Sequence, residues 1–335
     1  MVMTEEKRQP AEADDPARAI LFGLALGDAL GWPVEFLDRP LIRARYGRLG
    51  IVAPPDPALY TDDTQMTAAV AEALVEAGDQ DLDSLMAAVS RNFITWKNDP
   101  ITATRAPGAT CIRGVNALEL GAPWREAGVK DSKGCGACMR VAPLGYFYQH
   151  DVEKLLQTAR AQGWLTHRHP ASDAACLGAA RLIKLALDGV EPKDFPNQVR
   201  TRTEGVSKEF DATLERLDHV KDWTDEEAAL NYVGPTRGGG WIAEEAVGMA
   251  VYCVLRRPND YQAAVTLAAN ISGDSDTVAC ITGGVMGARL GISAIPADWI
   301  ERLENRDYLS GLAERLAEKR RALNAVPDTP RPVRS

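Results

Sequence analysis

The stretch TDDTQMTAAVAEALVEAG, residues 61–78, joins a helical repeat to a group of acidic residues. Met66, Val70 and Leu74 recur every four residues, which is the spacing of one face of a helix. Gly78 suits the position just after a helix end, where the backbone turns away. The stretch therefore predicts a helix that begins near Met66, with two aspartates and two threonines directly before it.

The same helical pattern recurs along the rest of the chain. An Ala- and Leu-rich segment at 171–188 stops at Gly189. Another segment at 244–257 is followed by Pro258, which cannot continue a helix. Leucines at helical spacing mark a last amphipathic helix over 309–323. Alternating β-branched residues are scarce and no strand–helix–strand rhythm is present, so we predict an all-α fold.

The composition is that of a globular protein, with 335 residues of which 45% are hydrophobic and 25% charged. Residues 1–16 and 326–335 have the polar or Pro-rich composition of flexible tails. The charge-rich region 200–227 predicts exposed helix with loops. Since no linker or internal repeat divides the remainder, we predict a single compact domain over 17–325.

The net charge and the cysteine content limit the classes of partner and the cellular compartment to be expected. A net charge of −9 argues against a protein that coats nucleic acid, because phosphates require a basic face. We expect no membrane span, because we identify no apolar stretch long enough to cross a bilayer. Residues 1–16 also lack the apolar core of a signal peptide. Six cysteines scattered through a long chain favour reduced thiols, and hence a cytoplasmic protein.

The acidic group at 61–64 has two readings. A helix N-cap accounts for Thr61 or Asp62, because a side-chain oxygen there accepts hydrogen bonds from free backbone N–H groups. It accounts less well for Asp62 beside Asp63, since neighbouring carboxylates repel each other unless a cation lies between them.

A second group, Gly273-Asp274-Ser275-Asp276-Thr277, also precedes a predicted helix, at 278–290. Its carboxylate and hydroxyl oxygens are the ligands that Mg²⁺, Mn²⁺ or Ca²⁺ prefer. Zinc is disfavoured because no histidine lies near either group. Taken alone, each group is as consistent with a helix cap or turn as with a metal site. Two similar groups together favour a shared centre for two metal ions.

Glycines in the helix after the second group predict a close helix contact. Gly283, Gly284 and Gly287 each cost a helix about 1 kcal/mol relative to alanine. Close approach of another helix would compensate for this cost and would bring the two acidic groups side by side in the core.

Five motifs, in order along residues 17–323, resemble the ADP-ribosylglycohydrolase family. Any one of them is weak evidence of kinship, but five in order with suitable spacing are specific. They are residues 23–31 followed by Glu35; residues 60–64; the Gly-rich stretch 134–143; Thr166, His167 and Asp173; and residues 273–277.

The resemblance implies an all-α orthogonal helical bundle around two Mg²⁺ or Mn²⁺ ions. It places Glu35 beside the metals, and it implies that Glu35 or Asp62 is the catalytic base that activates water. The metal ligands that it implies are Thr61, Asp62, Asp63, Asp274, Asp276 and Thr277.

The resemblance also implies a ligand loop and a reaction. The Gly-rich loop would wrap the pyrophosphate of ADP-ribose through backbone N–H groups, which small residues permit. Independently of the resemblance, Tyr146 is a candidate to stack on adenine, although core packing is the commoner fate of such aromatic residues. For His167 the resemblance implies a structural role or a place at the pocket edge. Many relatives have asparagine at position 135, and we interpret the spacing of Cys135 and Cys138 as a coincidence rather than a metal or redox motif. The loop residues are Gly134, Cys135, Gly136, Ala137 and Met139.

The expected function is removal of ADP-ribose from a modified protein by cleavage of the glycosidic bond at C1″. Arginine is the favoured attachment residue, the partner is an ADP-ribosylated protein and the product is ADP-ribose. An alternative is an immunity protein that binds and occludes an ADP-ribosyltransferase toxin, with or without hydrolysis. A Mg²⁺-dependent prenyl-diphosphate enzyme is disfavoured, because such sites repeat aspartates along one helix face.

Overall fold

The computed structural model describes residues 16–325. The predicted tails 1–16 and 326–335 lie outside the described residues, except for Pro16, which begins the first helix. Helices account for all regular structure in this range, apart from three isolated β-bridges, so the all-α prediction is confirmed. The α-helices are α1 Pro16–Gly31, α2 Arg39–Tyr46, α3 Asp62–Ala77, α4 Leu82–Asn98, α5 Ala109–Glu119, α6 Trp124–Ala127, α7 Ala142–Phe147, α8 Val152–Trp164, α9 Pro170–Leu187, α10 Phe195–Thr203, α11 Lys208–Val220, α12 Glu226–Val233, α13 Ala243–Arg256, α14 Tyr261–Ala269, α15 Ser275–Leu290, α16 Ala297–Arg302 and α17 Arg306–Ala325. Short 3₁₀ turns are η1 Trp32–Val34, η2 Thr102–Thr104, η3 Cys135–Ala137, η4 Pro192–Asp194 and η5 Ile292–Ala294.

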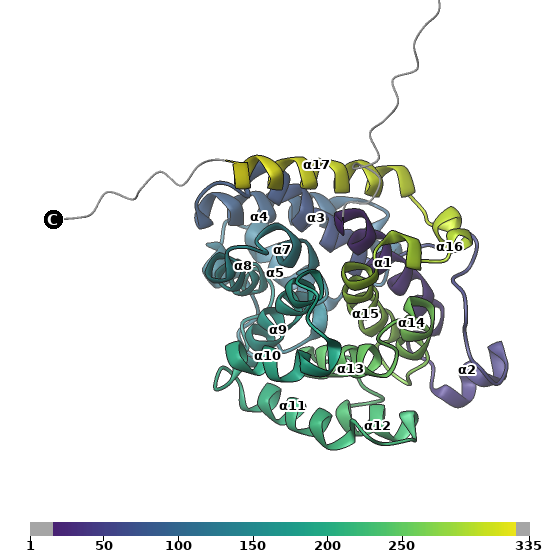
Figure 1. Ribbon diagram of the computed structural model, residues 1–335. Helices are drawn as coiled ribbons and strands as arrows, with labels where there is room; N and C mark the ends of the chain where they lie inside the picture. The colour runs from purple at the N-terminus through teal and green to yellow at the C-terminus, as the bar shows by residue number, and fades with distance from the viewer. Residues whose placement is uncertain (1–15, 326–335) are drawn as a thin grey trace, which may run out of the picture.

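Helices α1 and α15, from opposite ends of the chain, pack against each other at the centre of the molecule (Figure 1). A Cβ on Gly27 would lie 2.1 Å from the carbonyl oxygen of Ala279, and one on Gly283 would lie 2.1 Å from that of Gly23. Only glycine permits backbones to approach this closely. The prediction that another helix approaches the glycines of α15 is therefore confirmed, and that helix is α1.

Both acidic groups lie at helix starts: Asp62, Asp63 and Asp276 are in first helical turns, and Thr61 and Asp274 are the N-cap residues. α3 begins at Asp62, four residues earlier than predicted, because Thr61 is its N-cap and accepts the Asp63 N–H at 3.3 Å. α15 begins at Ser275, three residues earlier than predicted. The free N–H groups of both first turns therefore lie near the acidic side chains.

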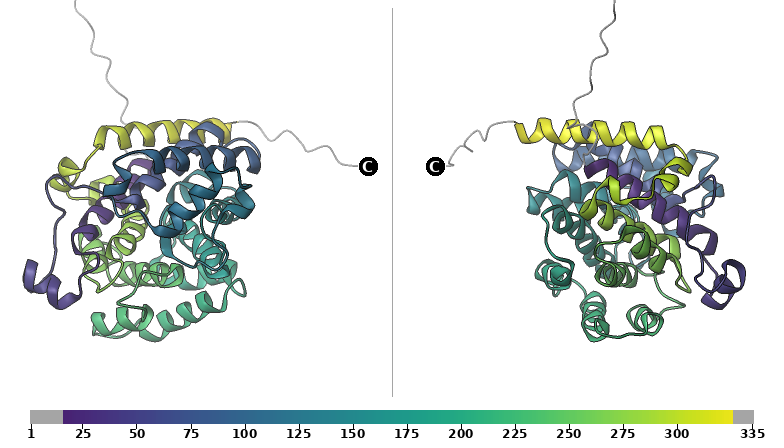
Figure 2. Two further views of the ribbon diagram at one scale, coloured as in Figure 1. Left: turned by 180° about the vertical axis from the view of Figure 1, so that it is seen from behind. Right: turned by 45° about the vertical axis from the view of Figure 1, so that its right-hand side comes forward.

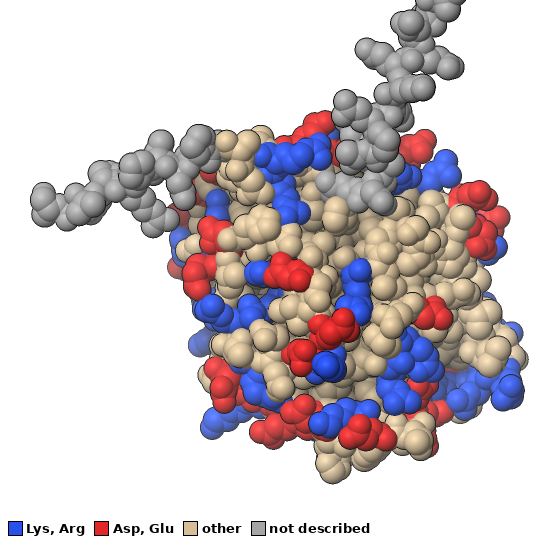
Figure 3. Space-filling view, in the orientation of Figure 1, with Lys and Arg blue, Asp and Glu red and all other residues tan. Residues whose placement is uncertain are grey.

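The other helices enclose this central pair. α17 lies along one side of the body, while α11 and α12 lie on the opposite side (Figure 1). α2 stands out at the edge of the molecule in both further views (Figure 2). On the face shown in Figure 3, basic and acidic side chains are interspersed, with a larger uncharged area toward α16.

The segment Pro16–Val34 corrects the expectation that no stretch is long and apolar enough to cross a membrane. It meets that criterion by length and composition, with a mean hydropathy of 1.2. In the structure, 83% of this window is buried within the protein, because α1 forms the centre of the helical core. Its apolar composition is therefore explained by its position in the core.

Candidate metal centre and active site

Asp28 joins α1 to the first acidic group. Its Oδ2 accepts hydrogen bonds from the Thr64 backbone N–H at 3.0 Å and from the Thr64 hydroxyl at 2.6 Å. Its Oδ1 accepts the backbone N–H of Thr61 at 3.0 Å. One buried carboxylate therefore satisfies the start of α3 and fixes it against the middle of the molecule.

The second acidic group is held by a loop of three glycines. The backbone N–H of Asp274 donates to the Gly239 carbonyl at 3.0 Å. Gly238, Gly239 and Gly240 have φ values of +88°, +95° and +86°, a region that side chains disfavour. A Cβ on Gly240 would lie 2.8 Å from that of Asp274, so glycine is also needed for space.

Carboxylates from three segments converge on one pocket of about 350 Å³. Glu35, Asp274 and Asp276 each offer an oxygen within 4.8 Å of the others, an arrangement that could hold a metal ion. Asp62 and Asp63 line the same pocket. The structure therefore brings together the acidic residues that lie more than 200 positions apart in the sequence.

No basic residue balances this charge: among the described residues that line the pocket, none is lysine or arginine. Asp63 Oδ1 and Glu35 Oε2 are buried and have no hydrogen-bond partner. Unpaired buried carboxylates are costly, and oxygen atoms of this kind suit a hard divalent cation. The residues present therefore fit the metal ions that the sequence predicted.

The pKa values reflect the same imbalance. Burial, reinforced by Asp276 and Asp274, raises the pKa of Glu35 to about 10. Burial raises the pKa of Asp62 to about 8, although the Gly108 N–H, 3.1 Å from its Oδ2, opposes the shift. Without a cation the pocket would therefore retain protons at neutral pH.

The remaining predicted metal ligands are the two threonines, which differ in position. Thr277 lines the pocket, and its backbone N–H donates to Asp276 Oδ1 at 2.9 Å. Thr61 is fully buried and is not among the lining residues, because its hydroxyl caps α3.

The Gly-rich loop forms another wall, with Gly134, Cys135, Gly136 and Met139 among the lining residues. Ala137 is buried behind them. A Cβ on Gly136 would lie 2.5 Å from Cys111 Sγ, and one on Gly134 would lie 3.1 Å from His167 Nε2. Packing therefore leaves no room for a side chain at Gly136 and little room for one at Gly134.

Cys135 contacts the second acidic group directly. Its Sγ donates to Asp274 Oδ2 at 2.8 Å, and burial raises the pKa of this thiol well above its usual value. Cys138 instead donates to the Cys135 carbonyl at 3.1 Å, and both cysteines are free. Position 135 therefore contacts a candidate metal ligand through its side chain as well as shaping the loop.

His167 and Tyr146 lie in different environments. His167 lines the pocket, with Nδ1 2.8 Å from the Thr166 hydroxyl, and burial beside Arg140 lowers its pKa to about 3, so the ring is neutral. Tyr146 is in the core beneath the guanidinium of Arg320 and is not among the lining residues. Its position matches the alternative of core packing rather than adenine stacking.

Sequence reasoning missed two residues of this region. Asp28 had a signal in the sequence, because it is the one acidic residue of α1 and stands in an apolar stretch of that helix. Phe36 had none: its ring stacks on that of Trp241, with centroids 5.1 Å apart and planes at 27°, and both rings line the pocket. The contact joins residues that lie 205 positions apart, which no local pattern encodes.

Comparisons with known proteins show which sequences this chain is similar to. The ADP-ribosylarginine hydrolase Tri1 of Serratia proteamaculans is 28% identical over 313 residues, covering 91% of this chain and 80% of the relative. The ADP-ribosyl-dinitrogen reductase glycohydrolase of Rhodospirillum rubrum is 27% identical over 300 residues, covering 87% and 90%.

A solved structure and a family profile extend the likeness. A structure of an ADP-ribosylglycohydrolase-related protein complex matches with a TM-score of 0.71 and 26% identity, covering 92% of this chain and 99% of the other. The profile of the ADP-ribosylglycohydrolase family matches residues 9–325. The chain therefore belongs to the ADP-ribosylglycohydrolase family.

Proposed function

We propose that this protein hydrolyses the C1″ glycosidic bond of ADP-ribosylated protein, with arginine as the modified residue and two Mg²⁺ or Mn²⁺ ions as cofactors. The observation that carries the proposal is the convergence of Glu35, Asp62, Asp63, Asp274 and Asp276 on one pocket without a basic residue. Such a site suits divalent cations and a substrate that they bind.

The nucleotide part of the substrate would lie along the glycine loop and the aromatic pair. Gly134 and Gly136 line one wall of the pocket, and backbone N–H groups of a loop without bulky side chains are suited to a pyrophosphate. Phe36 and Trp241 offer flat rings at the same pocket, to which a base could stack. When bound, the two cations would offset the carboxylate repulsion, hold the ribose hydroxyls and stabilise the charge that develops at the cleaved bond.

We assign the base to Glu35 in preference to Asp62. Asp62 Oδ2 already accepts the Gly108 N–H, whereas Glu35 Oε2 has no partner and can accept a proton from the attacking water. Asp62 would then orient the site from the first turn of α3. Cations near Glu35 would lower its pKa and keep it ionised.

The linkage and the compartment are also proposals. Arginine is favoured because the Serratia proteamaculans relative is named for ADP-ribosylarginine. A cytoplasmic location is supported by the six cysteines, all of which are free thiols.

The direct test is release of ADP-ribose from proteins modified on arginine or on serine, with Mg²⁺, with Mn²⁺ and after metal removal. We expect cleavage of the arginine linkage, dependent on metal. Glu35→Gln should lower kcat by about 100-fold or more, because it removes the base. The control is Asp298→Asn, a change at an exposed residue that pairs with Arg302.

The outcomes separate the parts of the proposal. Full activity after metal removal would overturn the metal mechanism. Cleavage of the serine linkage alone would correct the substrate. Equal kcat for Glu35→Gln and the control would exclude Glu35 as the base.

A further inference from the structure

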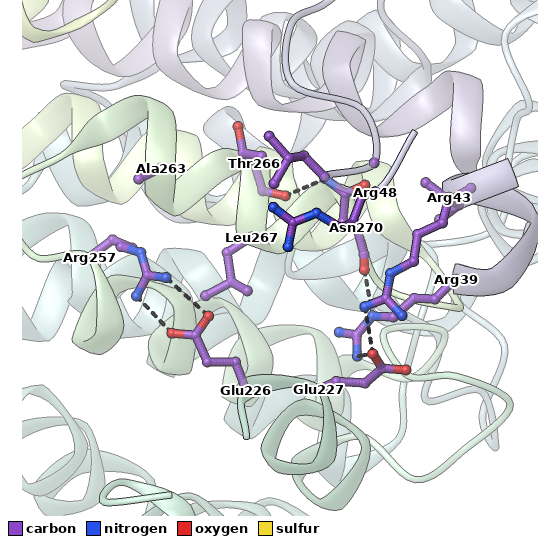
Figure 4. A pocket seen from close by; sticks show the side chains of 13 residues that line it. Arg39, Arg43, Arg48, Glu226, Glu227, Arg257, Ala263, Thr266, Leu267 and Asn270 are labelled. Atoms are coloured by element: carbon purple, nitrogen blue, oxygen red, sulfur yellow. Dashed lines mark hydrogen bonds and ion pairs between the residues drawn. The ribbon is translucent and has the colours of Figure 1, made fainter. Parts of the chain in front are cut away.

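A second hollow, of about 370 Å³, lies between α2, α12 and α14 (Figure 4). None of its lining residues lines the candidate metal pocket. Four arginines and two glutamates give it its character, and we name it the arginine hollow. They are Arg39, Arg43, Arg48, Arg257, Glu226 and Glu227.

Each glutamate of the hollow is shared by two guanidinium groups. Glu227 Oε2 lies 2.8 Å from Arg43 Nη2 and 3.6 Å from Arg39 Nη1. Glu226 accepts two hydrogen bonds from Arg257, at 2.7 and 3.0 Å, and one from Arg256. The hollow therefore keeps an excess of positive charge in a protein whose net charge is −9.

Two of the arginines have unused donors. Arg39 is only 5% exposed; its Nε donates to the Asn270 carbonyl at 2.6 Å, whereas Nη1 makes no hydrogen bond and has only the 3.6 Å ion pair with Glu227. Arg48 is exposed and lies over the hollow without any recorded partner among the described residues (Figure 4). A buried donor without a hydrogen bond is costly, so an anion that bonded to Arg39 Nη1 more closely than Glu227 does would be stabilised.

The chemistry of the hollow points to a phosphate. Planar guanidinium groups bind phosphate through two parallel hydrogen bonds, and several of them together favour a dianion. Ile42, Leu49 and Leu267 add apolar wall beside the arginines, which suits the organic part of a phosphate ester. The volume lies within the usual range of small-molecule sites.

We propose that the arginine hollow binds a small organic phosphate at a site separate from the hydrolase pocket. The site adjoins the segment that leads into the second acidic group. The backbone N–H of Arg39 donates to the Ser272 hydroxyl at 3.0 Å, two residues before Asp274. The proposal requires no hydrolase activity, because it rests on the charges and contacts of the hollow alone.

Calorimetric titration of the full chain in Mg²⁺ with AMP, ribose 5-phosphate and inorganic phosphate tests this site. We expect binding that weakens as salt is raised. Arg48→Ala should weaken it by about fivefold or more, through loss of a charged donor. Arg45→Ala is the matched control, since Arg45 is exposed at the end of α2 but does not line the hollow.

The identity of the tightest probe distinguishes the source of the phosphate. Tighter binding of the two esters would indicate an organic phosphate, whereas equal binding would indicate free phosphate and would contradict the organic part of the proposal. Absence of millimolar binding by all three probes would overturn it. Equal losses of affinity for Arg48→Ala and Arg45→Ala would also overturn the proposal. Binding that disappears in Asp276→Asn but persists in Arg48→Ala would overturn it too, because it would place the phosphate in the metal pocket.

Discussion

The metal pocket and the arginine hollow are both unbalanced in charge, but in opposite ways. In the metal pocket, buried carboxylates face one another without a basic residue, so their charge can be balanced only by a cation or by protons. In the arginine hollow, the excess guanidiniums share two glutamates and are partly open to water. The fold therefore depends strongly on what fills the first site and weakly on what fills the second.

The largest expected effect is loss of a central carboxylate. Asp276→Asn removes a candidate ligand that lies within 4.8 Å of two others, so metal affinity and ADP-ribose release should each fall by about 100-fold or more. Calorimetry with Mn²⁺ and a release assay would measure the two effects. Asp298→Asn, a change far from the pocket, should alter neither, and wild-type metal affinity in Asp276→Asn would remove this residue from the ligand set.

The next largest effect is expected for a substitution that disrupts the contact between α1 and α15 without removing a carboxylate. Gly27→Ala would place a Cβ 2.1 Å from the Ala279 carbonyl oxygen, which forces α1 away from α15. We expect the free energy of unfolding to fall by about 3 kcal/mol or more. Denaturant titration would measure it.

Gly284→Ala is the control for that substitution. Its Cβ would meet neighbours at 3.5 Å or more, an ordinary contact distance, so stability should be unchanged or slightly higher. Similar stabilities for the two variants would contradict the close contact of the helices.

The third prediction concerns pH without metal. Burial raises the pKa of Asp28 to about 7 and that of Asp62 to about 8 in the folded protein. Groups with a raised folded pKa contribute stability that is complete below their unfolded pKa near 4 and is lost as pH rises through the folded value. The metal-free Tm should therefore fall between about pH 5 and pH 9.

Saturating Mg²⁺ should reduce or reverse that fall, because a cation favours the ionised carboxylates. Differential scanning calorimetry at several pH values would measure both curves. A metal-free Tm that rises with pH over this range would contradict the charge imbalance in the pocket.

The smallest effect is expected at the arginine hollow, where removal of a carboxylate should strengthen ligand binding rather than weaken it. Glu227→Gln removes the carboxylate that competes for Arg39 and Arg43, so AMP should bind about 2- to 5-fold more tightly. Titration calorimetry would measure the change, with Glu215→Gln as a control outside the hollow. Weaker binding in Glu227→Gln would show that the glutamate supports the site rather than competing for it.

Periodic patterns predicted the helices but placed some of their starts too late. The helix predicted at 171–188 is α9, displaced by one residue. It was predictable because most of its small and apolar residues face the core. α3 and α15 begin earlier than predicted, since the polar residues at their starts do not contribute to an apolar repeat. Capping by Thr61 extends α3 to the aspartates, which the spacing of apolar residues could not show.

The site was predictable where a motif is local and not where it depends on tertiary contacts. Short local motifs contain Asp62, Asp63 and Asp276, so these residues could be recognised from the sequence alone. The stacking of Phe36 on Trp241 and the core position of Tyr146 follow from how distant helices pack. The arginine hollow likewise gathers residues from positions 39 to 270, whose charges are unremarkable in the sequence.

The contact between α1 and α15 has a consequence for biosynthesis. The partner of Gly27 is Ala279, so more than two hundred residues must be synthesised after α1 before that contact can form. Contacts of such long sequence separation form late, because the intervening chain must first be ordered. Asp28 is therefore synthesised well before the aspartates that complete the pocket. We expect a nascent chain that ends before about residue 290, the end of α15, to have no intact metal centre.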